Sequence, residues 1–469
     1  MKKTVLIVLL ALLGLLLLYV GFNRIDAKAD PGLFSAKDLP DADYDYENGY
    51  YRLWTLGLDD TVDVEAVAVK ERYRRLFDPQ FDNDKEIGAF AFTRHNKVET
   101  NITERLGRDL LQEIGRIGRV GDAPPPPLAT MLVKREAFLR FRERQPRILQ
   151  RYQRLLSSGF FQDFSLPRAD CPIPNLVTWL RLAKLHIGLS LVDAADGKWA
   201  EAADAMIRQM EFAKKAVAGS RVLITNLVAK AVLNLSVQGL AYLMNQEECP
   251  AEVFSRVLAA LPPIRYEEYG SRNGLIGEFL FFHEIVDLAA KGFKLSDVIG
   301  VKGFHPAPLL QKNRTLYDYF RQLQALLRLE TDPLQGDPGE ALAPRKRQKG
   351  AFWWLRNGTG KILLDVSSSN LGVVVFKSLR ARSIYDMTRI SAELHLRHDP
   401  SRSVQENLNL LETYRQTPDP CSGKPYIWNG KKQVLYSEGL DRIDGGGTYD
   451  KTSARTDVVL PVVLYIRAE

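Results

Sequence analysis

The chain has 469 residues, of which 45% are hydrophobic, so it is long enough to bury a large core and to form more than one domain. Its 64 basic and 57 acidic residues give a formal net charge of +7. The two signs are interspersed and no basic helix with interleaved aromatic residues occurs, which argues against nucleic acid as a partner and indicates a mixed solvated surface.

The N-terminal region carries an uncharged apolar run from Thr4 to Phe22, preceded by Lys2 and Lys3. The length of this run is close to the roughly 20 residues that a helix needs to cross a bilayer. The small residues of Ala27-Lys-Ala29 lie beyond intervening charges, too far from the run for a typical signal-peptide cleavage site. We therefore expect a retained transmembrane anchor rather than a cleaved signal. The flanking lysines place the N-terminus in the cytoplasm and the rest of the chain in the periplasm.

Residues 24–61 are rich in Asp and Tyr and show no periodicity, which predicts a spacer that is extended or packs as a strap on the body. Between residues 62 and 334, apolar residues recur at helical intervals and indicate a helical body. Helices are expected at 62–76, 102–117, 128–144, 148–156, 222–244, 251–261 and 273–290, with prolines 124–127 interrupting the chain.

The clearest helical signal covers residues 176–215. Asn175 is a predicted N-cap, followed by an apolar stripe and a turn at Gly197. Trp199 and Ala202 then begin a second helix, and we expect both to be buried where the two helices cross. This order of a Gly turn, an aromatic residue and a small residue resembles one tetratricopeptide hairpin. The resemblance implies an irregular stack of helical hairpins, because each apolar face needs a neighbour to cover it.

Residues 335–378 shift to Gly, Pro and charge, including Arg345-Lys-Arg-Gln-Lys349, and are expected to form a linker and junction. The aromatic cluster Phe352-Trp-Trp354 is expected to dock on the helical body. A long helix is then predicted from Leu379 to Leu396, and a shorter one from Val404 to Tyr414.

The chain ends with a turn at Asp419-Pro-Cys-Ser-Gly-Lys-Pro-Tyr-Ile-Trp428, a strand at Val434-Leu-Tyr-Ser437, and the acidic loop Asp444-Gly-Gly-Gly447. This ending resembles that of bacterial type II secretion pseudopilins. With the preceding helix, the resemblance extends more weakly over residues 379–463 and implies a small α+β module. Strand alternation puts Tyr426 and Trp428 on one face, and Leu435 on the opposite face to Tyr436, so we expect only one of the latter two to be fully buried. The chain departs from that family at Lys3-Thr-Val-Leu-Ile-Val, where the Gly and Glu of the pilin processing site are missing.

The pseudopilin resemblance implies calcium in the acidic loop, with Asp441, Asp444 and Asp457 at the matching ligand positions. Calcium takes six to eight oxygen ligands, which these carboxylates and neighbouring backbone carbonyls could supply. The alternative is a glycine-rich turn whose aspartates accept hydrogen bonds from backbone N–H groups. Both interpretations stay open on the sequence alone.

Other patterns carry less specific chemistry. His283 has Asp287 one turn on, where a zincin would place its second His, so we expect a hydrogen-bonded pair. His395 and His398 end a helix and fit its dipole as well as they fit zinc. Cys171, Cys249 and Cys421 are too far apart in sequence for a metal knuckle; two of them could pair, but buried thiols are the favoured interpretation.

These features predict a mainly α-helical protein with an anchor (1–23), a spacer (24–61), a helical body (62–334), a linker (335–378) and a pseudopilin-like α+β module (379–469). We expect a non-catalytic interaction or scaffold protein of the bacterial cell envelope, with the inner membrane and an envelope protein as partners and no cofactor other than calcium. One alternative is an accessory component of a secretion or pilus-like machine. Another is an envelope hydrolase or small-molecule binder whose site is assembled only in the fold.

Overall fold

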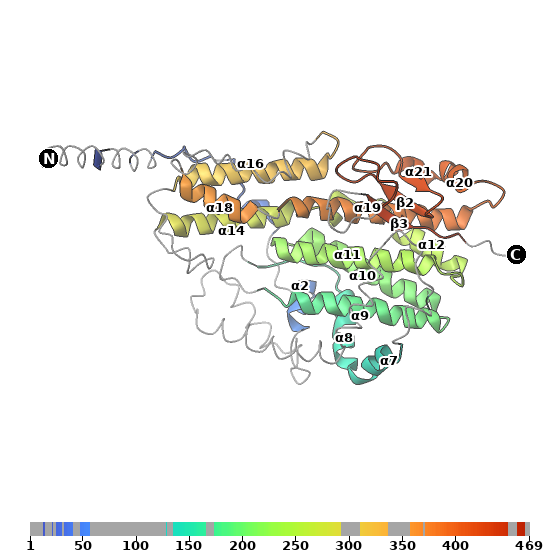
Figure 1. Ribbon diagram of the computed structural model, residues 1–469. Helices are drawn as coiled ribbons and strands as arrows, with labels where there is room; N and C mark the ends of the chain where they lie inside the picture. The colour runs from blue at the N-terminus through green and yellow to red at the C-terminus, as the bar shows by residue number, and fades with distance from the viewer. Residues whose placement is uncertain are drawn as a thin grey trace, which may run out of the picture.

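The computed structural model describes residues 13–14, 21, 25–30, 32–40, 47–56, 128, 135–165, 173–291, 310–335, 357–368, 371–448 and 457–464. Over these residues the protein is mainly helical, with a small antiparallel sheet near its C-terminus, as the sequence predicts. Most of the long helices run along one common direction, and the sheet lies at one end of the bundle (Figure 1). The helices expected at 62–76 and 102–117 and the aromatic cluster at 352–354 lie outside the described residues.

The described helices and strands follow one another along the chain as η1 (Ala36–Asp38), α2 (Gly49–Thr55), α7 (Arg135–Arg144), α8 (Pro146–Leu156), α9 (Leu176–Ala195), α10 (Trp199–Gly219), α11 (Leu223–Met244), α12 (Ala251–Ala260), α13 (Tyr266–Tyr269), α14 (Arg272–Ala290), α16 (Lys312–Thr331), α18 (Gly358–Ser368), α19 (Leu371–Arg397), α20 (Val404–Leu410), α21 (Glu412–Gln416), β1 (Ile427–Asn429), β2 (Val434–Ser437) and β3 (Val458–Pro461).

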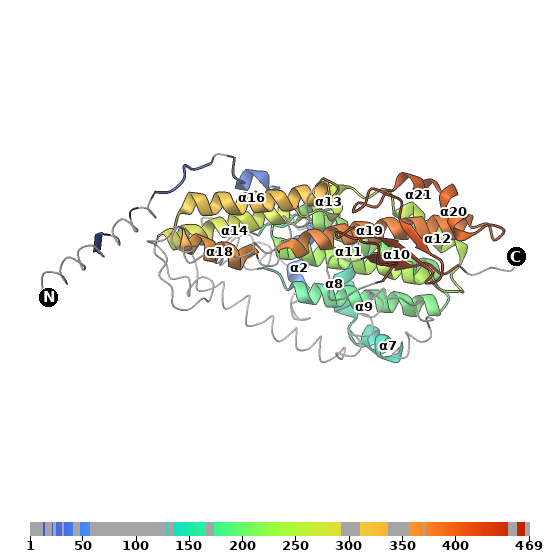
Figure 2. The ribbon, with the colours of Figure 1, turned by 45° about the horizontal axis from the view of Figure 1, so that its top comes forward.

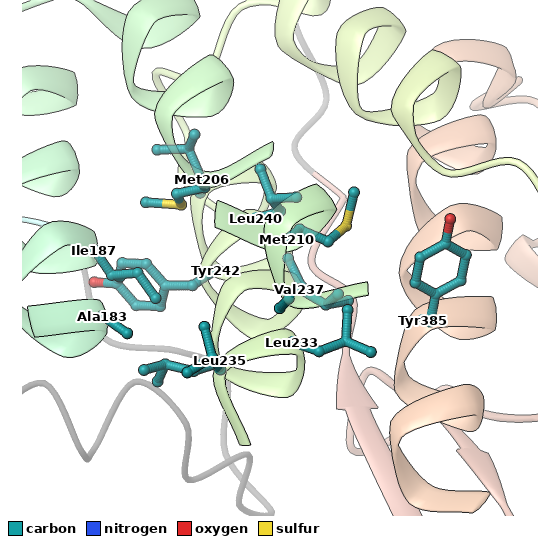
Figure 3. Packing of buried hydrophobic residues seen from close by; sticks show 14 of the residues in the cluster. Ala183, Ile187, Met206, Met210, Leu233, Leu235, Val237, Leu240, Tyr242 and Tyr385 are labelled. Carbon is teal, nitrogen blue, oxygen red and sulfur yellow. The ribbon is translucent and has the colours of Figure 1, made fainter. Parts of the chain in front are cut away.

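The first hydrophobic core forms around α9, α10 and α11. Asn175 caps α9 as predicted, because its side chain accepts the N–H of Thr178 at 3.0 Å. Side chains from α9, α10, α11 and α19 gather in this core (Figure 3). Gly239 of α11 permits a close crossing, since a Cβ there would lie 3.1 Å from the Met206 sulfur and 3.4 Å from Ile187. Both α9 and α11 are buried on nearly all sides, which explains their continuous hydrophobicity.

The predicted burial of Trp199 and Ala202 at the hairpin crossing is wrong in one respect. Ala202 is 1% exposed, as expected, but Trp199 is only half-buried. It is the first residue of α10 and lies at the turn end of the hairpin. The fully buried tryptophan is Trp179 in the first turn of α9, whose ring packs edge-on against Phe212 at a centroid distance of 5.9 Å.

A second hydrophobic core joins α14, α16, α18 and the first half of α19. Helix α16 is not among the predicted helices, although Leu316, Phe320 and Leu323 recur there at helical spacing and are buried. Helix α18 occupies part of the predicted linker, and α19 begins at Leu371, two turns before the expected Leu379. The 27-residue α19 therefore contributes to both cores, with Leu379 in the second and Ile384 in the first.

The described strands form a three-stranded antiparallel sheet in the order β1-β2-β3. Tyr426 and Trp428 both pack in the first core, as strand alternation predicts. Leu435, which pairs with Leu460, packs in the same core. The expectation that only one of Leu435 and Tyr436 is fully buried is wrong, because they are 1% and 3% exposed. The glycine loop covers the second face: a Cβ at Gly447 would lie 3.1 Å from the Tyr436 ring.

Among the described residues, two helical stretches are long and apolar enough to cross a membrane, Leu223–Met244 and Gly358–Arg397. In the first stretch, 78% of the most apolar 18-residue window is buried inside the protein, as expected of a core helix. Most of the apolar run Thr4–Phe22 lies outside the described residues, so the N-terminal anchor stays a prediction.

Candidate functional site

Part of the predicted spacer packs on the body as a strap, which we define as residues 25–30 and 32–40. The Asp26 carboxylate accepts the backbone N–H groups of Asn313 at 2.7 Å and Arg314 at 3.1 Å. The side-chain amide of Gln311 donates to the Ile25 carbonyl oxygen at 2.9 Å. Asp26 thus satisfies N–H groups that the first turn of α16 leaves without helical partners, and its negative charge complements the helix dipole.

Further along the strap, Phe34 inserts between two helices. Its ring centroid lies 5.8 Å from that of Phe279 on α14 and 4.9 Å from that of Phe320 on α16, both in edge-on geometry. The Arg272 guanidinium then donates to the Asp38 carbonyl oxygen at 3.5 Å. The strap therefore packs against both α14 and α16, and it is the blue segment beside α16 in Figure 2.

A buried polar cluster joins four helical elements, and we call its members Lys230, Ser271, Glu330 and Ser378 the lysine cluster. The Lys230 ammonium donates to the hydroxyl of Ser378 at 2.5 Å and to that of Ser271. The two serine hydroxyls lie 2.9 Å apart. A Glu330 carboxylate oxygen lies 3.8 Å from the Lys230 nitrogen. All four residues are 2% exposed or less.

The Glu330 carboxylate is also held by neutral donors. Its second oxygen accepts the Tyr266 hydroxyl at 2.7 Å and the Ser271 backbone N–H at 2.9 Å, so it lies at the N-terminal end of α14. Burial lowers the pKa of Lys230 to about 8; Glu330 opposes this shift and Lys377 adds to it. The arrangement can act as a buried ion pair that fixes four elements. In its neutral form the Lys230 amine could also accept a proton from a serine hydroxyl.

The lysine cluster is not among the sites predicted from the sequence. Lys230 is nevertheless the sole charged residue between Leu223 and Met244, within an otherwise apolar helix. A lone cation at a core position needs a buried partner, and that signal alone could have drawn attention to it. Its partners Ser271, Glu330 and Ser378 come from distant parts of the chain and carry no local pattern.

A second polar cluster fastens the C-terminal sheet to α19. The Tyr426 hydroxyl donates to the Asp386 carboxylate at 3.2 Å, and the Arg382 guanidinium lies 3.6 Å from the same carboxylate. Burial raises the pKa of Asp386 to about 6 despite the charge of Arg382. Asp419 organises the preceding turn, since it accepts the Ser437 hydroxyl of β2 at 2.7 Å.

The predicted calcium ligands bind backbone groups of their own loop. Asp457 accepts the N–H groups of Gly445 at 3.3 Å, Gly447 at 2.8 Å and Thr448 at 3.2 Å. Burial, with a smaller contribution from the charge of Asp444, raises the pKa of Asp457. These contacts match the alternative of a glycine turn held by aspartates.

The other two predicted ligands have separate contacts. Asp444 accepts the Tyr436 hydroxyl at 2.8 Å and the Gly446 N–H at 2.8 Å. Asp441 accepts the N–H of Ile443 at 3.2 Å. Within the described residues, no group of three or more His, Cys, Asp or Glu side chains is placed to hold a metal ion. Part of the loop, residues 449–456, lies outside the described residues, and calcium binding stays a prediction.

The remaining candidates have structural contacts. The His283 ring nitrogen lies 3.7 Å from the Asp287 carboxylate, which also pairs with Lys312 at 2.7 Å. His395 bridges α19 and the chain after β3, with one ring nitrogen 3.0 Å from the Val463 carbonyl oxygen. Cys249 and Cys421 are buried, as expected. Cys171 lies outside the described residues.

No protein-family model, curated protein or solved structure matches this chain. The resemblances to the pseudopilin ending and to a tetratricopeptide hairpin therefore stay predictions. The assignment of function has to rest on the contacts described above.

Proposed function

We propose that the protein is a non-catalytic interaction or scaffold protein of the bacterial cell envelope. In this proposal the run Thr4–Phe22 anchors it in the inner membrane, and the helical body faces the periplasm. The body holds a partner protein of the envelope at the membrane surface.

The single observation that supports this proposal best is the fastening of the strap. Asp26 binds the first turn of α16 only a few residues after the apolar run ends. Phe34 adds an apolar contact with Phe279 and Phe320. If the spacer only tethered the body to the membrane anchor, it would stay solvated, because ordering each residue costs roughly 1–2 kcal/mol of conformational entropy. A fixed connection is useful where the position of the body relative to the membrane matters, as in a scaffold.

The test is the membrane distribution of a partner protein. Full-length chain with an affinity tag after Glu469 is purified from native membranes in mild detergent, and proteins recovered in constant ratio to it are identified. The matched control deletes the gene and measures the same proteins in membrane and soluble fractions. A scaffold should recover at least one envelope protein, and that protein should leave the membrane fraction in the deletion strain. Unchanged distribution of every recovered protein would contradict the proposal.

A hydrolase is the second candidate, and the lysine cluster favours it. Lys230 has a pKa of about 8 and is hydrogen-bonded to two serine hydroxyls. Such a lysine, once neutral, can act as the general base that activates a serine nucleophile. The burial of all four residues opposes it, because a substrate would need an opening. A fluorophosphonate probe should label the solubilised full-length chain, and Ser271→Ala or Ser378→Ala should abolish the labelling. A wild-type chain that stays unlabelled would exclude this candidate.

A further inference from the structure

We infer that one end of the helical bundle faces the phospholipid headgroups and that the C-terminal sheet lies at the far end. The membrane-facing end comprises the last turn of α14 and the first turns of α16 and α18. This inference rests on the proposed membrane anchor and adds to it which surface of the body meets the bilayer. The partner of this end is therefore a lipid surface.

The length of the connecting chain limits how far this end can be from the membrane. The apolar run ends at Phe22, and three residues later the Ile25 carbonyl oxygen accepts a hydrogen bond from the Gln311 side chain of the body. Three residues span at most roughly 11 Å even when fully extended.

The order of contacts along the strap gives the direction. Asp26 contacts the first turn of α16. Phe34 then packs on Phe279, and the Asp38 carbonyl receives the Arg272 guanidinium at the start of α14. The strap thus runs from the end of α14 towards its beginning. The strap leads away from the bilayer as the chain proceeds, because its first bound residue is the one nearest the apolar run.

Three helix ends are held together beside the start of the strap. The Lys312 ammonium of α16 pairs with the Asp287 carboxylate near the end of α14 at 2.7 Å. The Asn357 side chain, at the start of α18, accepts the Gln311 N–H at 2.8 Å. The C-terminal end of α14 and the N-terminal ends of α16 and α18 therefore form one surface, which is at the left of Figure 1.

The sheet lies at the opposite end because of α19. Its first half packs in the second core beside α14 and α16, whereas Asp386 and His395 of its second half contact the sheet region. A helix of 27 residues is about 40 Å long at 1.5 Å per residue. The sheet, α20 and α21 are thus held tens of ångströms from the bilayer.

Two matched single-cysteine variants test this orientation. Lys291 at the end of α14 and Lys431 in the turn between β1 and β2 are both exposed. Each is changed to cysteine in full-length chain whose Cys171, Cys249 and Cys421 are replaced by alanine, and thermal melts check that the variants fold. The cysteine carries a nitrobenzoxadiazole fluorophore, and the protein is reconstituted into phosphatidylcholine vesicles. A spin label on the lipid headgroups in both leaflets quenches on contact, so the direction of insertion does not affect the result.

The label of Lys291→Cys should be quenched several-fold more than that of Lys431→Cys. Adding Asp26→Ala and Phe34→Ala to release the strap should reduce this difference. Equal quenching, or stronger quenching at Lys431→Cys, in protein that floats with the vesicles would overturn the orientation and leave the anchor intact. Protein that does not float with the vesicles would overturn both the anchor and the inference.

Discussion

At the scale of single residues, the Lys230 ammonium and the Glu330 carboxylate are buried together and share the hydroxyls and N–H groups around them. Removing one partner of such a pair leaves the other charge uncompensated. We expect Lys230→Met to lower the free energy of unfolding by about 3–5 kcal/mol. The double variant Lys230→Met/Glu330→Gln should recover much of this loss. Urea denaturation of the solubilised full-length chain measures both.

Comparing the double variant with Lys230→Met alone and with Glu330→Gln alone decides whether the two residues interact. If the two losses simply add, Lys230 and Glu330 do not interact, and the lysine cluster is not a unit. Ser378→Ala is a milder companion change, since it removes one hydroxyl from the cluster without removing a charge. We expect it to cost about 1–3 kcal/mol, the range for leaving a buried donor without its partner.

Asp386 gives a prediction about pH. Burial raises its pKa from 3.8 to about 6 in the folded protein. Between these values the unfolded chain ionises first, so the contribution of Asp386 to stability is present below about pH 4 and is lost as the pH rises to about 6. The loss is of the order of 2–3 kcal/mol, at about 1.4 kcal/mol per pKa unit.

We expect Asp386→Asn to remove this loss. Relative to the wild type, the variant should gain stability steadily from pH 4 to pH 6 and then level off, as measured by urea midpoints across that range. Asp204→Asn on the exposed surface serves as the matched control, because Asp204 pairs with Arg256 where both side chains are 40% exposed. A constant difference between Asp386→Asn and the wild type over the whole range would show that Asp386 is not the titrating group.

At the scale of secondary-structure elements, the α9–α10 hairpin contains two tryptophans, Trp179 and Trp199, that differ in how deeply they are buried. Trp179→Ala should cost roughly 3–5 kcal/mol, because its side chain is fully buried against Phe212. Trp199→Ala should cost clearly less, since Trp199 is half-buried at the turn. Thermal melts of the two variants give the comparison. Equal losses would mean that Trp199 is packed as deeply as Trp179.

The crossing of α14 with the chain before α11 depends on Gly277. A Cβ at Gly277 would lie 1.8 Å from the Arg221 carbonyl oxygen, closer than any real contact. Helix propensity alone favours alanine over glycine by roughly 0.5–1 kcal/mol, so an uncrowded site would be stabilised. We expect the opposite sign, a loss of stability in Gly277→Ala measured by urea denaturation. A gain in stability would show that α14 does not approach Arg221 so closely.

Local patterns predicted most of the described helices. Asn175 predicts the start of α9 because it is an N-cap residue, and its side chain does cap the helix. The apolar stripe predicted for α10 is buried at Ala202, Met206 and Met210. Strand alternation correctly placed Leu435 and Tyr436 on opposite faces of β2, in different hydrophobic clusters. The burial of Tyr436 was not predictable in this way, because the glycine loop that covers it arrives from residues further along the chain.

For the candidate sites, too, local sequence patterns did not predict contacts between residues that are distant in the sequence. The aspartates of the glycine loop lie in one segment of the sequence, from Asp441 to Asp457, so both interpretations of that loop could be stated in advance. The lysine cluster combines residues from 230 to 378, and only the fold brings them together. The strap contact of Asp26 with α16 likewise joins positions nearly 300 residues apart, as the separation of 287 between Asp26 and Asn313 shows.

At the scale of the whole molecule, two hydrophobic cores share α19, and the strap lies on the second of them. The central claim is that the apolar run holds this body on the periplasmic face of the inner membrane. Alkaline phosphatase, which becomes active only outside the cytoplasm, can be fused after Glu469 and assayed in the membrane pellet after carbonate extraction. We expect phosphatase activity in that pellet. An inactive fusion would place the body in the cytoplasm, and activity released into the supernatant would show that the chain is not anchored.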